Sequence, residues 1–188
     1  MNCANCPTGN SCYQGKSCID QGSKQLEYDE AENLKILSVA SKLEAEYYMK
    51  ITRIEEVIRF SQEMGYTRLG IAFCVGLAKE AKELLAIFSQ YFQIHSVCCK
   101  VCGINKTEFQ VPNIKSDRYE AACNPIGQAK YLNEAHTDLN LIVGLCIGHD
   151  VLFSKYSESP VTTLVVKDRV LAHNPLGAVY SNYWRRKF

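Results

Sequence analysis

The sequence predicts a three-layer α/β fold, in which helices cover both faces of a mostly parallel sheet of four to five strands, as in Rossmann or flavodoxin-like domains. Short apolar runs of strand length alternate along the chain with longer segments whose apolar residues recur at helical spacing. Such alternation is typical of parallel sheets, because each strand is followed by a helix that returns the chain to the same edge. The 188 residues suffice to bury the core of one such domain with a small extension.

Composition divides the chain into three regions. Residues 1–22 form a Cys-rich N-terminal cap with few large apolar side chains, so burial alone cannot order them. Residues 23–66 carry two helical patterns and form a two-helix extension, with Gly65 placed to end the second helix. Residues 67–188 contain the predicted strands and form the α/β domain.

The first half of the α/β domain has two strands. The apolar run 69–75 is the first strand, and an amphipathic helix of about four turns follows over 77–92. The second strand covers 93–99. A polar connection then leads to a helix that begins near Pro125, a residue suited to the first turn of a helix.

The second half repeats the pattern. A third strand covers 139–145, a short helix runs through Phe153, and a fourth strand covers 161–166. A brief return strand over 169–172 and a C-terminal helix around Trp184, packed back on the body, complete the predicted fold.

The charge pattern excludes several classes of partner. The net charge is +1, which gives no electrostatic reason to bind nucleic acid or an acidic membrane. No run approaches the roughly 18 apolar residues of a membrane helix, and no secretion signal is recognisable. We therefore expect a cytoplasmic protein, whose thiols stay reduced and serve metal binding or redox chemistry rather than structural disulfides.

Four of the ten cysteines open the chain with the spacing C-x₂-C-x₅-C-x₅-C: Cys3, Cys6, Cys12 and Cys18. A tetrahedral metal ion and an iron–sulfur cluster both require thiolates in such numbers. Structural zinc sites often use two C-x₂-C pairs, and only the first pair here has that spacing. Zinc and an iron–sulfur cluster therefore both remain possible at this site.

A second group of cysteines follows the predicted strands. In an open α/β sheet the carboxyl ends of the strands form the ligand-binding edge, so these thiols should converge although they lie far apart in sequence. Cys98 is expected to point the opposite way from its neighbour and to be buried. Thiolates from several strand ends favour a 4Fe–4S cluster, with zinc as the alternative. The predicted ligands are Cys74, Cys99, Cys102, Cys123 and Cys146.

His149 is a candidate cofactor-binding residue at the same edge. It follows Cys146 by three residues, within a turn that Gly144 and Gly148 allow to approach a ligand closely. It could ligate metal, transfer a proton or donate a hydrogen bond to cluster sulfur, or it could simply be a helix-capping or solvated histidine. His173 follows the last strand and is a second candidate. His95 and His136 are interpreted as structural.

The segment Cys99-Lys100-Val101-Cys102 also matches the C-x-x-C redox signature. In thioredoxin-like proteins a helix begins at this motif and activates the first thiol, whereas Gly103 and a long polar loop follow here. Dithiol chemistry is therefore an alternative to metal ligation. There is no Gly-rich phosphate loop and no dinucleotide fingerprint, so no nucleotide cofactor is expected.

These motifs together carry a family resemblance. Besides the cysteine-rich start they are Phe73-Cys74-Val75-Gly76-Leu77, Cys99-Lys100-Val101-Cys102-Gly103, Cys123-Asn124-Pro125, Gly148-His149-Asp150 and Val166-Lys167-Asp168-Arg169-Val170. Over nearly its whole length the chain resembles an uncharacterised metal-binding protein family of bacteria and archaea, many of them anaerobes (domain of unknown function 1847). The resemblance implies metal binding and no particular reaction.

Three functions follow from these observations. The first is an iron–sulfur protein with a redox or sulfur-handling role at the sheet edge, which would act with a redox partner or a small-molecule substrate. The second is a zinc-stabilised, non-catalytic binding or regulatory module. The third is a thiol–disulfide oxidoreductase that uses Cys99 and Cys102. Neither nucleic acid nor a membrane is expected as a partner.

Overall fold

The computed structural model describes residues 2–6, 9, 11–16 and 28–188. The chain divides into two compact units, Met1–Met49 and Lys50–Phe188. In the smaller unit the described elements are two short 3₁₀ helices, η1 (Cys3–Asn5) and η2 (Ser11–Gln14), and the helix α1 (Ala31–Tyr47). Val39 and Leu43 are the buried residues of α1, and their spacing of four places them on one face of the helix.

The larger unit begins with the helix α2 (Arg53–Met64), whose two ends have clear local causes. A capping box starts the helix: Glu55 N–H donates to the Thr52 hydroxyl, and the Glu55 carboxylate accepts from Thr52 N–H at 2.8 Å. Gly65 ends it with a left-handed φ of 76°, as the sequence predicts. The apolar side of α2 packs on the sheet through Val57 and Ile58.

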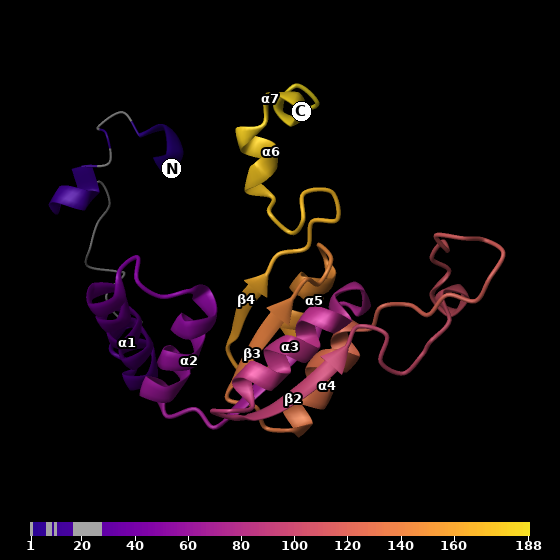
Figure 1. The fold of residues 1–188 in the computed structure, drawn as a ribbon, viewed down its shortest axis with the longest axis horizontal. Helices are drawn as coiled ribbons and strands as arrows, with labels where there is room; N and C mark the ends of the chain where they lie inside the picture. The colour runs from indigo at the N-terminus through magenta and orange to yellow at the C-terminus, as the bar shows by residue number, and fades with distance from the viewer. Residues whose placement is uncertain (1, 7–8, 10, 17–27) are drawn as a thin grey trace. The chain divides into compact units, whose positions relative to one another are not determined.

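The sheet has four strands, β1 (Arg68–Phe73), β2 (Gln93–Cys98), β3 (Leu139–Val143) and β4 (Val161–Val165). All pairs are parallel and the order is β2-β1-β3-β4 (Figure 1). Phe73 pairs with both Cys98 and Val143, so the carboxyl ends of three strands are level. The predicted parallel α/β fold is confirmed.

Helices cover both faces of the sheet because alternate strand residues point to opposite sides. Leu69 and Ile71 of β1 share one core with α2 and α3 (Ala78–Phe88). Ala72 and Ile142 share the other with α4 (Pro125–Glu134) and α5 (His149–Tyr156) (Figure 1).

Two sequence predictions near the C-terminus are wrong. Residues 169–172 form turns instead of a return strand, because the Asp168 carboxylate accepts hydrogen bonds from the N–H groups of Val170 and Leu171 and closes the chain on itself. The single C-terminal helix is two short ones, α6 (Leu176–Tyr180) and α7 (Asn182–Arg185), and neither contains a buried residue. Trp184 contacts Tyr183 and Lys187 near it in the chain.

The helix predicted over 77–92 is also shorter than expected, since α3 ends at Phe88 and residues 89–92 form turns before β2. In the described part of the chain no helix is both long and apolar enough to cross a membrane.

Candidate functional site

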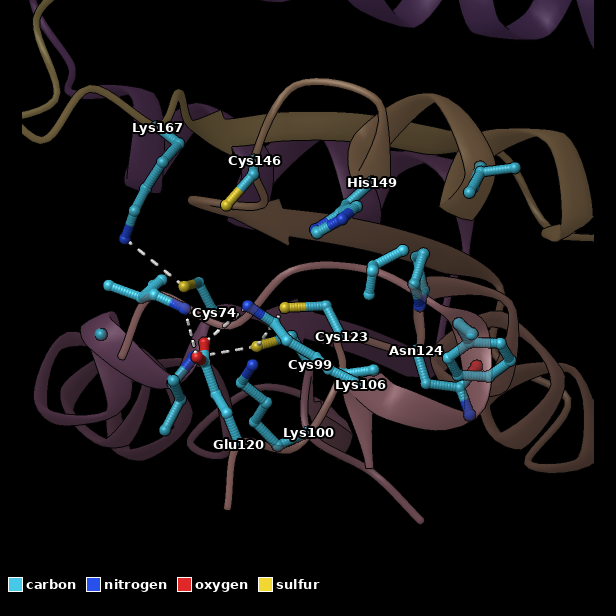
Figure 2. Close-up of a pocket in the computed structure, with 18 of the residues that line it drawn as sticks. Cys74, Cys99, Lys100, Lys106, Glu120, Cys123, Asn124, Cys146, His149 and Lys167 are labelled. Carbon is cyan, nitrogen blue, oxygen red and sulfur yellow. Dashed lines mark hydrogen bonds and ion pairs between the residues drawn. The ribbon is translucent and has the colours of Figure 1, made fainter. Parts of the chain in front are cut away.

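A cavity of about 740 Å³ lies at the carboxyl end of the sheet. It is lined by residues that lie within four positions after the ends of the four strands, by the loop before α4, and by residues in the first turns of α4 and α5 (Figure 2). The lining combines thiols with cationic side chains. Its chemically active residues are Cys74, Cys99, Cys123 and Cys146, Lys100, Lys106, Lys167 and Arg169, and Glu120 and His149.

The topology explains why the cavity forms here. From β1 the chain crosses to β2 on one side and from β3 it crosses to β4 on the other, so the connections diverge between these adjacent strands. Ligands of open α/β sheets bind at such a switch point, outside the carboxyl ends of the strands. Cys74 directly follows β1 and Cys146 lies three residues after β3, so these two thiols flank the switch point.

Gly144 directs the chain from β3 toward Cys146. It has a φ of +64°, and its N–H donates to the carbonyl of Val165 at 2.8 Å. A Cβ atom at this position would lie 1.9 Å from Leu77 Cδ1, so only glycine fits without displacing its neighbour. The chain then turns tightly, with the N–H of His149 donating to the carbonyl of Cys146 at 2.9 Å, and both side chains line the cavity.

Cys99 and Cys123 form a close pair. The N–H of Asn124 donates to the Cys99 carbonyl at 2.8 Å, which holds the two backbone segments side by side. The Sγ atoms are 3.8 Å apart, within hydrogen-bonding range for sulfur. The N–H of Val75 donates to Cys99 Sγ at 3.3 Å, and Cys99 is only 2 % exposed.

This pair divides its protons unequally. The hydrogen bond with Cys99 lowers the pKa of Cys123 to about 5, and the nearby charges of Lys100 and His149 act in the same direction against burial. The pKa of Cys99 is raised, chiefly by the same hydrogen bond and by burial. The two shifts are opposite, so the pair favours one thiolate and one thiol over two thiolates.

Two cations contact the other thiols. Lys167 Nζ lies 3.4 Å from Cys74 Sγ (Figure 2). Arg169 Nη2 lies 3.0 Å from Cys146 Sγ, a contact that raises the pKa of the guanidinium. Lys100 donates to the carbonyl of Ala121 at 2.5 Å. Among the residues that the structure describes, none of these three cations forms a salt bridge with a carboxylate, although the charge of Lys100 helps to lower the pKa of Glu120.

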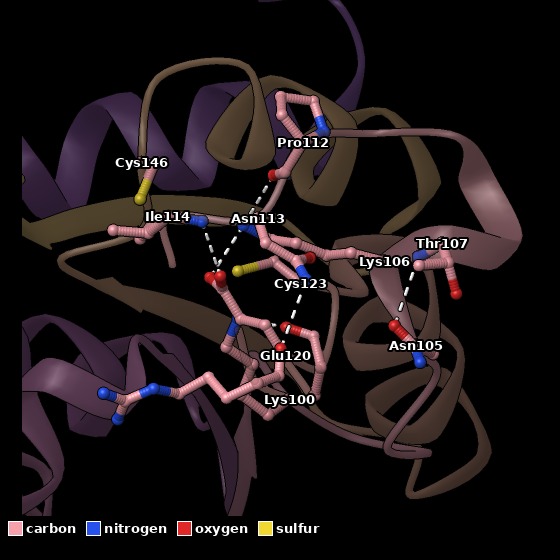
Figure 3. A network of polar contacts seen from close by, with 12 residues as sticks. Lys100, Asn105, Lys106, Thr107, Pro112, Asn113, Ile114, Glu120, Cys123 and Cys146 are labelled. Atoms are coloured by element: carbon pink, nitrogen blue, oxygen red, sulfur yellow. Dashed lines mark hydrogen bonds and ion pairs between the residues drawn. The ribbon is translucent and has the colours of Figure 1, made fainter. Parts of the chain in front are cut away.

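One wall of the cavity comes from the loop of residues 104–122, which an internal polar network shapes (Figure 3). Lys106 Nζ lies 2.7 Å from Glu120 Oε1 and donates to the Pro112 carbonyl at 3.2 Å. The other oxygen of Glu120 accepts from the N–H of Ile114 at 2.7 Å. The loop ends are joined by an antiparallel bridge between Asn105 and Ala121.

Four of the five inner thiols predicted as ligands lie on the cavity, and their role as ligands stays a prediction. Cys74, Cys99, Cys123 and Cys146 all line the cavity, and His149 lines it with them. Cys98 is half-buried in β2 and packs against the core beneath α4 and α5. Cys102 is different: it is exposed, has a left-handed φ of 71° and does not line the cavity.

The N-terminal cysteines belong to the smaller unit. Cys3 and Cys12 are exposed and Cys6 is half-buried, whereas Cys18 lies outside the described residues. Their role as metal ligands stays a prediction.

The other histidines do not line the cavity. His95 lies within β2, and His136 has a left-handed φ of 49° in the turn after α4. His173 accepts a hydrogen bond at Nδ1 from the N–H of Asp168 at 3.2 Å. This hydrogen bond stabilises the turn that follows β4.

The inner thiols surround a space rather than a point. In the part of the chain that the structure describes, no group of three His, Cys, Asp or Glu side chains could hold one metal ion as they stand. Cys99 and Cys123 are adjacent, but a single ion would require Cys74 or Cys146 to approach them.

The cations of the site are not among the residues predicted from the sequence. Lys167 and Arg169 belong to a distinctive motif that by itself predicts no role for them, and Lys100 lies between the two cysteines of a C-x-x-C motif. Their common signal is position: each follows a parallel strand within a few residues, at the edge where the thiols also lie.

Comparisons with known proteins place the chain in a family. The uncharacterised protein MJ0455 of Methanocaldococcus jannaschii is 54 % identical over 189 aligned residues, which span all of this chain and 97 % of that protein. No solved structure matches the chain. Residues 12–164 match the model of a family described as a protein of unknown function, DUF1847. Neither description names a metal or an activity. On the family match and on this relative, the chain belongs to the DUF1847 family.

Proposed function

We propose that the cavity holds an inorganic centre bound by cysteine thiolates, a 4Fe–4S cluster in preference to a zinc ion, and that the protein serves electron transfer or sulfur handling. The observation that carries the proposal is the meeting of four thiols from four separate chain segments on one cavity. A free cysteine that only fills the core packs among apolar side chains, whereas cysteines that act as thiolates lie near cationic side chains, as these do.

The ligands would be Cys74, Cys99, Cys123 and Cys146, which is the number of thiolates that such a cluster takes. When bound, the cluster would supply one-electron transfer, or an iron open to substrate if one thiolate were displaced. His149 lies on the same lining, where it can donate a hydrogen bond to sulfur or move a proton.

The charges around the cavity support an anionic occupant. Lys100, Lys167 and Arg169 form no salt bridge with a carboxylate in the described part of the chain, so thiolates and a cluster would offset their charge. Lys167 and Arg169 each contact the sulfur of a proposed ligand. Hydrogen bonds to ligand sulfur are one of the means by which proteins set the reduction potential of a cluster.

A cluster suits the inner site better than zinc for a geometric reason. Zinc places all its thiolates about 2.3 Å from one point, and the described thiols do not approach such an arrangement. The N-terminal cysteines, Cys3, Cys6, Cys12 and Cys18, would hold a second centre, for which zinc and a cluster remain equal alternatives.

Anaerobic purification with iron, sulfide and zinc analysis tests the proposal. A protein in which the four N-terminal cysteines are replaced by serine isolates the inner site, and it should retain iron, sulfide and visible absorption. Adding Cys74→Ser should remove most of them, while Cys98→Ser, a matched change of a thiol outside the cavity lining, should not. A colourless, iron-free protein would refute the cluster, and stoichiometric zinc in its place would support the zinc-stabilised module.

A second candidate function is thiol–disulfide exchange, now with Cys99 and Cys123 as the pair. The 3.8 Å between their Sγ atoms favours it, and the exposed Cys102 is a less suitable partner. The Cys123 thiolate would attack a substrate disulfide and release one thiolate. Cys99 would then lose its proton, attack the Cys123 sulfur of the mixed disulfide and release the second thiol, leaving a Cys99–Cys123 disulfide.

Trapping distinguishes this candidate. A Cys99→Ser protein should accumulate a mixed disulfide on Cys123 when treated with a small disulfide substrate, and Cys102→Ser should behave as the unmodified protein. If Cys102→Ser traps the adduct instead, the original C-x-x-C interpretation is correct.

A further inference from the structure

The cavity is larger than an inorganic centre alone requires. Its volume of about 740 Å³ lies within the range of about 300–1,000 Å³ that is typical of small-molecule pockets. A cluster against the thiols would occupy only part of it. The remaining space faces an apolar wall formed by Phe109, Val111, Pro112 and Ile114 of the loop 104–122, with Ile126 of α4 and Leu152 of α5.

The apolar wall is only partly covered by the protein. Ile114 is 85 % exposed and Phe109 is 55 % exposed, although both line the cavity. The contacts of Glu120 with Lys106 and with the N–H of Ile114 order the loop. The apolar side chains are therefore exposed on an ordered loop. A ligand with an apolar body would cover these side chains, and the burial would favour binding.

The lining also carries cationic side chains. Glu120 is the one carboxylate among the lining residues, all of which are described, and Lys106 already pairs with it. Lys100, Lys167 and Arg169 form no salt bridge with it, so the lining has more cationic side chains than carboxylates. Arg169 is exposed and uses only Nη2 on Cys146, so the guanidinium has further N–H donors to offer.

We propose that this cavity binds a small organic carboxylate, with its carboxylate group at Arg169 and Lys167 and its apolar body against Phe109 and Ile114. The planar guanidinium matches a carboxylate in a two-pronged contact. A phosphate ester fits less well, because the sequence has no Gly-rich phosphate loop. The site adds a ligand beside the proposed inorganic centre and does not depend on the identity of that centre.

Calorimetric titration of the full-length protein, purified anaerobically with the metal it retains, tests the proposal. The probes are sodium benzoate and sodium hexanoate, with benzyl alcohol as the uncharged analogue and inorganic phosphate as the anion without an apolar body. Both carboxylates should bind at a single saturable site. Arg169→Gln should weaken them about tenfold or more, and Phe109→Ser should also weaken them. Arg185→Gln, an exposed arginine of α7, is the matched control and should leave binding unchanged.

Four results would overturn the carboxylate site: no saturable binding of either carboxylate, equal binding by Arg169→Gln, equal affinity for benzyl alcohol, or tighter binding of inorganic phosphate than of both carboxylates. Circular dichroism of each variant verifies that it is folded. Iron, sulfide and zinc are measured on the same samples. Carboxylate binding by metal-free protein would leave this inference standing while the proposed cluster fails, and metal without carboxylate binding would do the reverse.

Discussion

The two cysteine groups of this chain differ in what positions their thiols. Cys3 and Cys12 lie on the short 3₁₀ helices η1 and η2, in which no residue is buried. Three of the inner thiols follow strands of a hydrogen-bonded parallel sheet, and Cys123 lies two residues before α4. Cys99 is almost completely buried. The inner site is therefore built by the fold before any ligand arrives, whereas the described part of the N-terminal region has no core of its own.

From this difference we expect metal binding to stabilise the two regions unequally. A ligand set held by rigid elements gains precision, because the backbone has already lost its freedom on folding. A ligand set on a segment without a core must use the binding energy of the metal to order the chain.

Removal of metal should separate the two regions most clearly. On the proposal that both groups bind metal, a chelator should greatly increase hydrogen exchange in residues 2–16 and leave the amides of β1 and β3 protected. Mass-spectrometric hydrogen exchange before and after chelation measures both effects. Simultaneous loss of protection in the sheet would show that the inner site also depends on metal for folding.

Alanine at two glycines tests the same contrast without metal. Gly144 and Gly9 have similar left-handed φ values, +64° and +61°, but a Cβ on Gly144 would meet Leu77 at 1.9 Å while one on Gly9 would meet nothing within 4 Å. Gly144→Ala should lower the free energy of unfolding by about 2–4 kcal/mol. Gly9→Ala carries only the strain of the left-handed φ and no clash, so it should lower the free energy of unfolding by less, about 1 kcal/mol. Urea unfolding measures both, and equal effects would contradict the contrast.

The thiol pair predicts a pH dependence for the reduced, metal-free protein. Cys123 has a lowered pKa of about 5, so its contribution to stability is present above the unfolded thiol value of about 8.5 and is lost as the pH falls toward 5. Cys99 has a raised pKa, so its contribution is present below about 8.5 and is lost at higher pH.

Together the two thiols place their joint contribution at a maximum near pH 8.5. Urea unfolding between pH 5 and 10 should show stability rising and then falling relative to a Cys99→Ala/Cys123→Ala protein. A flat difference across this range would mean that the pair does not share its proton as described.

The smallest effect is expected in the loop that forms the apolar wall. The Lys106–Glu120 pair is mostly buried, with side chains 15 % and 20 % exposed, whereas Arg118 and Asp117 in the same loop are 61 % and 78 % exposed. Lys106→Gln should speed hydrogen exchange at Ile114, because Glu120 loses the partner that aligns it. Arg118→Gln should have no measurable effect. Faster exchange in both variants would show that the loop lacks the local order described here.

Much of the fold could be read from residue patterns. The apolar runs before Cys74 and Cys146 are short and nearly continuous, as expected for strands buried on both faces, whereas the edge strand before Cys99 contains polar residues and is only partly buried. Gly65 and Pro125 mark helix ends by local backbone chemistry alone. The errors came where a local side-chain bond overrode the pattern, as at Asp168, or where a helix was too short to bury a face, as at Trp184.

The residue pattern alone predicts the parallel sheet. In such a sheet the carboxyl ends of all strands lie at one edge, and the pattern therefore also predicts where the inner thiols meet, namely Cys74, Cys99, Cys123 and Cys146. Only the tertiary structure decided that Cys99 pairs with Cys123 rather than Cys102, and that Lys167 and Arg169 contact the other sulfurs. Those contacts depend on distances between segments that are remote along the chain. The alternation of apolar residues specifies which elements form, but not how closely their ends approach one another.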